Sequence, residues 1–160
     1  MAVKRDAGVQ HPNREKAASR ATRAVVLLLL VVSAALVAIV AVGGWGVLDG
    51  GKAAVVAYIL IYLVIAFYVA RWNRGVLPVA AALAIILLIL AAVAVPGWLD
   101  RDAPGYEQTT LDASVLGLVC ALIVPVQVLL IAFAMRGFDQ AWNVEVERPA
   151  PGHGAAPTAA

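Results

Sequence analysis

Three residues lie in the middle of long apolar stretches, where their chemistry is unusual. Pro125 and Gln127 interrupt one stretch, and Tyr62 interrupts another. Proline frees a backbone carbonyl and bends a helix, while a glutamine among apolar side chains needs a hydrogen-bond partner. One interpretation is a hinge or a polar binding site, for a quinone or a lipid headgroup. The other, which we adopt, is an interhelical hydrogen bond from Gln127 to Tyr62 or to the freed carbonyl.

Other patterns that support catalysis or ligand binding are missing from the apolar stretches. They contain no nucleophile with a base, no acid pair, no phosphate-cradling glycine loop and no metal-ligand spacing. The two histidines, His11 and His153, lie outside them, so they offer no pair of haem ligands there. We therefore expect a protein that is not an enzyme and that has no cofactor, no metal ion and no nucleic-acid partner.

Composition and run length indicate how these residues are positioned. The chain has 160 residues, of which 63% are hydrophobic and 14% charged, whereas soluble domains are roughly 45–50% apolar. Crossing a hydrocarbon layer of about 30 Å takes about 20 helical residues. Four uncharged segments are about that long, and they span 24–42, 53–70, 76–95 and 113–135. The predicted fold class is an all-α integral membrane protein, an up-and-down bundle of four transmembrane helices with short loops.

The remaining segments are short and polar. Residues 1–23 form a basic segment, 136–148 a juxtamembrane segment, and 149–160 a tail rich in Pro, Gly and Ala that should be disordered. The first apolar run is longer than the core of a cleaved signal peptide, so we expect an uncleaved anchor.

Basic residues predict the orientation of the bundle. Cytoplasmic segments of membrane proteins carry an excess of Lys and Arg. On one side only Lys52 and Arg101 are basic, so the other side, which carries both termini, is expected to be cytoplasmic. The Ala, Val, Gly and Arg usage suggests a bacterial inner membrane. The residues expected to set the topology are Arg20, Arg23, Arg71, Arg74 and Arg136.

The tryptophans give an independent indication of the two membrane boundaries. Indole side chains favour the interface between hydrocarbon and headgroups. Trp45 and Trp98 lie at the outer ends of the first and third segments, and Trp72 and Trp142 lie at or beyond the inner ends of the second and fourth. All four are predicted to be interface anchors.

Small residues indicate a helix contact in the fourth segment. Ala113, Gly117 and Ala121 recur every four residues. Such a stripe lets two helix backbones approach closely in lipid. We expect it to face a neighbouring helix.

The outer loop and the C-terminal segment each have two interpretations. An Asp-x-Asp pair begins at Asp100 and resembles the start of a calcium loop, but Leu111 stands where such a loop places its glutamate. We expect instead that Thr110 or Asp112 caps the last helix. Residues 143–147 alternate Val and Glu like a strand that needs a partner edge. An extended linker is the alternative.

These observations favour a function that depends on the packing of helices and not on catalysis. The bilayer itself is the first expected partner, and other membrane subunits or further copies of the chain are the next. We expect an accessory or assembly subunit of a larger membrane complex, such as a respiratory one. The alternative is a small oligomeric transporter or channel that lacks a charge within the membrane and lines its pathway with Gln127 and tyrosines.

Overall fold

The protein is almost entirely helical. A computed structural model describes residues 9–10 and 12–147, so residues 1–8 and the tail expected at 149–160 lie outside the described residues. Four helices are long and apolar enough to cross a membrane, as expected. The elements are β1 (Val9–Gln10), α1 (Pro12–Glu15), α2 (Ala17–Gly43), α3 (Lys52–Ala70), the 3-10 turn η1 (Arg74–Val76), α4 (Leu77–Leu99), the 3-10 turn η2 (Asp100–Asp102), α5 (Ala113–Asp139) and β2 (Val146–Glu147).

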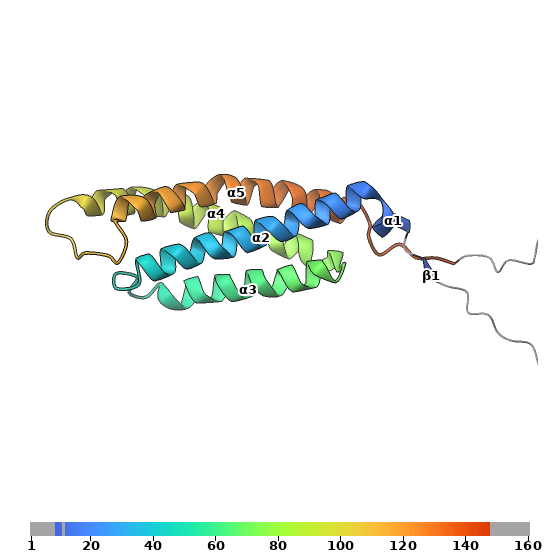
Figure 1. Ribbon diagram of the computed structural model, residues 1–160, viewed down its shortest axis with the longest axis horizontal. Coiled ribbons are helices and arrows are strands. Elements are labelled where there is room, and N and C mark those ends of the chain that lie inside the picture. Colours follow the sequence, from blue (N-terminus) through green and yellow to red (C-terminus); the bar gives the residue numbers. More distant parts are fainter. Residues whose placement is uncertain (1–8, 11, 148–160) are drawn as a thin grey trace, which may run out of the picture.

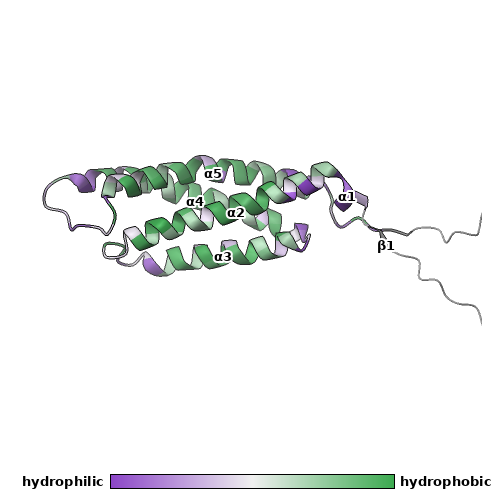
Figure 2. Ribbon diagram, in the orientation of Figure 1, coloured by the Kyte–Doolittle hydropathy of each residue, from purple (hydrophilic) through white to green (hydrophobic). Residues whose placement is uncertain are grey.

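The four long helices form an elongated bundle in which consecutive helices run in opposite directions (Figure 1). Helix α2 packs against α3 and α5, and α4 packs against α5, whereas α3 and α4 make little contact. The bundle is apolar along its length and hydrophilic near its ends (Figure 2). We call the end that carries α1 and the two strands the termini end, and the opposite end, which carries the connection 100–112, the loop end.

The helices extend past three of the predicted boundaries by more than one residue. Helix α2 begins at Ala17 rather than at residue 24. Helix α4 continues through Pro96 to Leu99, although Pro96 lacks the N–H that would bond the Ala92 carbonyl. Helix α5 continues through Gly137 to Asp139. A Cβ on Gly137 would lie 3.1 Å from both Leu77 Cδ1 and Trp142 Cζ2, so this glycine admits two close neighbours rather than ending the helix.

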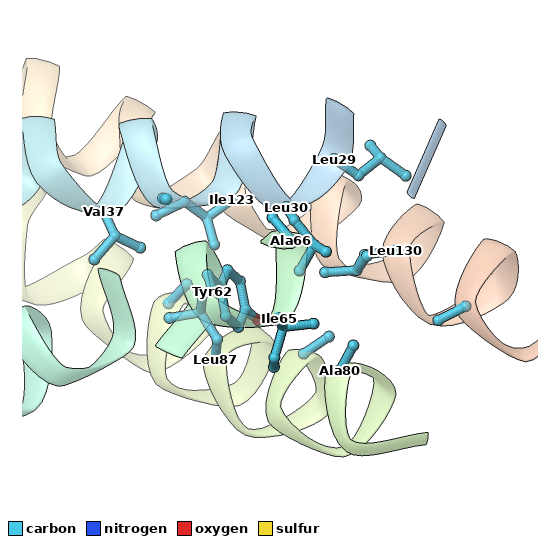
Figure 3. Packing of buried hydrophobic residues seen from close by; sticks show 14 of the residues in the cluster. Leu29, Leu30, Val37, Tyr62, Ile65, Ala66, Ala80, Leu87, Ile123 and Leu130 are labelled. Atoms are coloured by element: carbon cyan, nitrogen blue, oxygen red, sulfur yellow. The ribbon is translucent and has the colours of Figure 1, made fainter. Parts of the chain in front are cut away.

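The core runs the length of the bundle and is built largely from small and branched aliphatic side chains. Alanines allow the helix backbones to approach, and Ala80, Ala84 and Ala134 are completely buried. Larger side chains fill the space between them, among them Leu30, Leu130 and Tyr62 (Figure 3). The bundle is therefore held by packing around a continuous apolar core.

The strand expected near residue 147 and the cap expected before α5 differ from the predictions. Strand β2 pairs antiparallel with β1, Val9 opposite Glu147 and Gln10 opposite Val146, so the same chain supplies the partner edge. Asp112 lies at the N-cap of α5, but its side chain accepts no capping hydrogen bond. The Thr110 amide instead donates to the Gly43 carbonyl (2.9 Å), which ties the loop to the end of α2.

Candidate functional site

A chain of hydrogen bonds crosses the middle of the bundle. The Tyr62 hydroxyl on α3 donates to Gln127 Oε1 on α5 over 2.9 Å. Gln127 Nε2 donates to the Ser33 hydroxyl on α2 over 2.9 Å, and that hydroxyl donates to the Leu29 carbonyl over 2.7 Å. The bond expected between Gln127 and Tyr62 is therefore present, and it belongs to a longer chain that joins three helices. We call Ser33, Tyr62 and Gln127 the polar bridge.

The polar bridge is shielded from its surroundings. Ser33 and Gln127 are 0% exposed and Tyr62 is 1% exposed. Tyr62 lies beside Ile65 and Leu87, on the side of α3 that faces α4 (Figure 3). The glutamine amide uses both its oxygen and its nitrogen within the bridge, so the two ends of its dipole are satisfied by protein groups. Such an arrangement fixes the helices relative to one another and keeps the bonded groups out of contact with the surroundings of the bundle.

Ser33 was missed by the interpretation of the sequence. A serine in a helix can bond the carbonyl four residues before it, so it can lie in an apolar helix with no other partner. Ser33 does bond Leu29 in this way and also accepts from Gln127. The available signal was that Ser33 is the only hydroxyl residue in the first apolar segment.

Pro125 does not join the polar bridge. It lies on α5, which is continuous from Ala113 to Asp139, and its side chain is exposed on the outside of the bundle. The structure thus places Gln127 inward and Pro125 outward, although only one residue separates them.

The stripe of small residues on α5 is only partly buried. Ala113 and Gly117 face the interior, whereas Ala121 is exposed. A Cβ on Gly117 would stand 2.9 Å from Leu99 Cδ2 and 3.4 Å from Trp98 Cβ, so the glycine gives α4 a close approach. The buried face of α5 continues through Cys120 and Ile123 to the polar bridge.

The tryptophans lie in different surroundings. Trp45 is 48% exposed and Trp72 is partly exposed. Trp98 and Trp142 are buried, and their indoles pack against Gly44 and Gly137 respectively. For these last two the observed contacts are with the protein itself, and interface anchoring stays a prediction for all four tryptophans.

A second polar cluster lies at the termini end. The Arg23 guanidinium donates to the Val69 and Ala70 carbonyls at the end of α3, and its Cζ lies 4.4 Å from the centre of the Trp72 ring. The Trp72 and Trp142 rings pack edge to face, with centroids 5.4 Å apart. One of the residues expected to set the topology therefore also joins α2 to α3.

The other basic residues expected to set the topology are more exposed. Arg71 stacks over Phe67 and Arg74 over Phe138, with the guanidinium carbons 4.9 and 5.2 Å from the ring centres. Arg20 and Arg136 are exposed.

The same cluster ties the N-terminal segment to the C-terminal one. Asn13 donates to the Ala141 carbonyl over 3.1 Å, and Arg14 Nε donates to the Trp142 carbonyl over 3.0 Å. Gln140 on the adjoining turn donates to the Thr22 hydroxyl over 3.0 Å. Together with the pairing of β1 and β2, these bonds join the two ends of the described chain.

The loop end carries most of the acidic residues that the structure describes, but it shows no metal-binding geometry. No group of three or more His, Cys, Asp or Glu side chains within the described part of the chain could hold a metal ion. Arg101 lies over the Trp98 and Tyr106 rings, 5.6 and 5.7 Å from their centres. The connection 100–112 is thus organised around an arginine between two aromatic rings.

An apolar cavity lies beside the polar bridge, nearer the loop end. Its volume is about 160 Å³, and side chains from all four long helices line it. Tyr58 is among them, and its ring packs edge to face against Tyr62, with centroids 5.8 Å apart. Tyr58 therefore lines the cavity and also contacts Tyr62 of the polar bridge.

The chain matches no protein-family model, no curated protein and no solved structure. Its function is therefore inferred from the residues and geometry described above.

Proposed function

We propose that the four helices cross a bacterial inner membrane and that the termini end faces the cytoplasm. The distribution of basic residues supports this orientation, because positive charge is retained on the cytoplasmic side. Of the described basic residues only Lys52 and Arg101 lie near the loop end. The described basic residues near the termini end are Arg14, Lys16, Arg20, Arg23, Arg71, Arg74 and Arg136.

Within that membrane we propose that the protein is a non-catalytic accessory or assembly subunit of a larger complex, such as a respiratory one. The observation that supports this proposal is that the polar bridge is buried and that its side chains bond one another. Transport and catalysis within a membrane need polar groups that face a pathway or a substrate. Here the mid-bundle glutamine is completely buried and bonded at both ends of its amide, so it serves helix packing.

The outside of the bundle supports a role in assembly. Large aliphatic side chains cover it, including Leu60 and Val64 on α3 and Ile89 and Val93 on α4. Such a surface suits both lipid tails and the helices of other subunits. Helices in lipid associate by packing and not by the hydrophobic effect, so an apolar face is no obstacle to a partner.

Purification from native membranes in mild detergent, followed by native mass spectrometry, tests the proposed role. We expect the chain to leave the membrane with at least one different subunit in fixed stoichiometry. A homo-oligomer that contains no other protein would contradict the proposal. That result would favour a small transporter or channel built from several copies.

A further inference from the structure

The cavity between α3 and α4 has the features of a ligand site. It measures about 160 Å³, and its walls are almost wholly apolar. An apolar cavity of roughly this size stays free of water and takes apolar guests as large as benzene. The residues that line the cavity include Ala54, Tyr58, Ala91, Ala94, Trp98 and Cys120.

The residues that line the cavity indicate that it opens between α3 and α4. Its walls include exposed side chains of both flanking helices, Ala54 on α3 and Leu90 on α4. These two helices make little contact with each other, whereas α2 and α5 pack closely and close the back of the cavity. With the bundle in a membrane, the opening faces the acyl chains of the bilayer.

One polar group at the cavity wall needs a partner. The Tyr58 hydroxyl makes no hydrogen bond to any residue that the structure describes. Tyr58 lies six residues into α3, about 9 Å below its first residue at a rise of about 1.5 Å per residue. A helical tyrosine leans toward the N-terminus of its helix, which here is the loop end. Its hydroxyl therefore lies near the border between hydrocarbon and headgroups. There a partly exposed donor that faces lipid and not water still requires an acceptor.

We propose that this cavity binds one acyl chain of a membrane phospholipid, which enters between α3 and α4 with its ester carbonyl accepting a hydrogen bond from the Tyr58 hydroxyl. The cavity is too small for another helix, about 10 Å across, but it suits a narrow apolar chain. An ester carbonyl at the head of that chain supplies the acceptor that Tyr58 lacks. The proposal rests on the proposed membrane placement and does not depend on the role in assembly.

Quenching of Trp98 fluorescence by brominated lipid tests the proposal, because Trp98 lines the cavity yet is only 6% exposed. A chain with Trp98 as its single tryptophan is made by replacing Trp45, Trp72 and Trp142 with Phe. It is then reconstituted into phosphatidylcholine vesicles brominated in the upper part of the acyl chains. We expect strong quenching, because the cavity brings a brominated chain against the buried indole.

Filling the cavity should abolish that quenching. Ala91→Leu adds a side chain inside the cavity, and Ala54→Leu fills it from α3 should the first variant fold poorly. Ala92→Leu is the matched control, because Ala92 is exposed and does not line the cavity. Helix content from circular dichroism verifies the fold of each variant. Quenching that survives both filling variants would overturn the proposal.

A second single-tryptophan chain that keeps Trp45 separates the possible failures. Trp45 is exposed, so membrane insertion alone should expose it to the brominated chains. Quenching of Trp45 without quenching of Trp98 would show that protein or empty space, and not lipid, occupies the cavity. If neither is quenched, the membrane placement itself is wrong, and the lipid site falls with it.

Native mass spectrometry of the full chain tests the hydrogen bond. Tyr58→Phe removes only the hydroxyl and should lower the ratio of lipid-bound to lipid-free protein about fivefold, the effect of one hydrogen bond of ordinary strength. Tyr68→Phe is the control, because Tyr68 lies on the same helix, outside the cavity. Equal retention of phospholipid by both variants would contradict the role of Tyr58. Retention of an unesterified fatty acid or a quinone would identify a different occupant and overturn the assignment to phospholipid.

Discussion

Gln127 joins three helices because its amide offers an acceptor and a donor on opposite sides. Tyr62 on α3 uses the acceptor, and Ser33 on α2 receives the donor. Within the apolar core no water competes for these groups, so each bond favours one arrangement of the helices over others. The residue therefore contributes to the specificity of the bundle as well as to its stability.

Replacing Gln127 with leucine should destabilise the bundle. The substitution removes two interhelical hydrogen bonds, each worth about 0.6 to 2 kcal/mol in membrane proteins. We expect the free energy of unfolding in detergent to fall by about 1 to 3 kcal/mol. Thermal or denaturant unfolding followed by circular dichroism measures the change.

A double-mutant cycle isolates the bond between Gln127 and Tyr62. Tyr62→Phe combined with Gln127→Leu should show a coupling energy of about 1 kcal/mol. The matched pair uses Tyr58→Phe, because Tyr58 has no hydrogen bond to Gln127, and should show almost no coupling. If Gln127→Leu left the free energy of unfolding unchanged but abolished the biological activity of the protein, Gln127 would be a functional residue and not a structural one.

Gly44 should tolerate no side chain, because the Trp98 ring covers it. A Cβ there would collide with Cη2 of Trp98 and lie 3.1 Å from Cζ2. The rigid, buried indole cannot move aside easily, so Gly44→Ala should cost about 1 to 3 kcal/mol of stability. Gly46→Ala is the control, because a Cβ on Gly46 meets no atom within 4 Å. Equal unfolding midpoints for the two variants would show that Trp98 does not pack as described.

For individual residues, the sequence predicted the hydrogen bond between Gln127 and Tyr62 but not the part of Ser33 in the polar bridge. Gln127 and Tyr62 could be matched because each is a polar residue at mid-depth with few alternative partners. Ser33 satisfies itself through Leu29, so its type alone does not demand a second partner. Ala121 was predicted to face a neighbouring helix, but it is exposed. A regular spacing of small residues does not determine which of them faces the interior.

At the scale of the helices, the end of α3 shows how one arginine can serve two purposes. Trp72 follows that helix with φ of 62°, a left-handed conformation that usually favours glycine. Its ring lies between the Arg23 guanidinium and Trp142, and these contacts offset the backbone strain. Arg23 also places positive charge against the carbonyls that end α3, where the helix dipole favours it.

Removing the Arg23 guanidinium should loosen the last turn of α3. A helix-end charge is worth about 0.3 to 1 kcal/mol, and the stacking on Trp72 adds a comparable amount. We expect the amides of residues 71–73 to exchange with deuterium about three to thirty times faster in Arg23→Met. Hydrogen exchange with mass spectrometry measures the peptide that contains them.

Arg20→Met supplies the comparison for that experiment. Arg20 precedes Arg23 by one turn and is exposed, so its loss changes the charge equally without removing the cap. Similar exchange rates in the two variants would mean that charge near the bundle end, and not the contact with α3, protects these amides.

Helix boundaries were the least predictable feature of the elements. Pro96 and Gly137 are both residues that usually end helices, yet both lie inside one. Pro96 leaves the Ala92 carbonyl without its partner in the helix but does not prevent α4 from continuing to Leu99. Gly137 is retained because Leu77 and Trp142 occupy the space that a side chain would need. That reason depends on residues distant in the sequence, so no local pattern could reveal it.

At the scale of the whole molecule, the sequence predicted the number of long helices but not how they pair. Apolar residues surround most of each helix, so no polar face indicates which side turns inward. Pairing instead depends on shape, such as the fit of Gly117 to α4, and on the polar bridge between α2, α3 and α5.

The segment before α2 and the segment after α5 are joined to each other. Residues that precede α2 pair with residues that follow α5, through β1 and β2 and through the Asn13 and Arg14 side chains. Because four helices that alternate in direction return the chain to the end of the bundle where it began, both segments can meet. That both termini share the cytoplasmic side of a membrane stays a prediction.

Cysteine accessibility tests most directly the central claim, that an apolar bundle crosses the membrane with its termini end in the cytoplasm. In a Cys120→Ala background, which removes the only native cysteine, Glu107→Cys probes the loop end and Glu145→Cys probes the termini end; both positions are exposed. In intact spheroplasts of a bacterial host, a membrane-impermeant maleimide should label position 107 at once and position 145 only after permeabilisation. Labelling of position 145 from outside, or of both positions equally, would contradict the account.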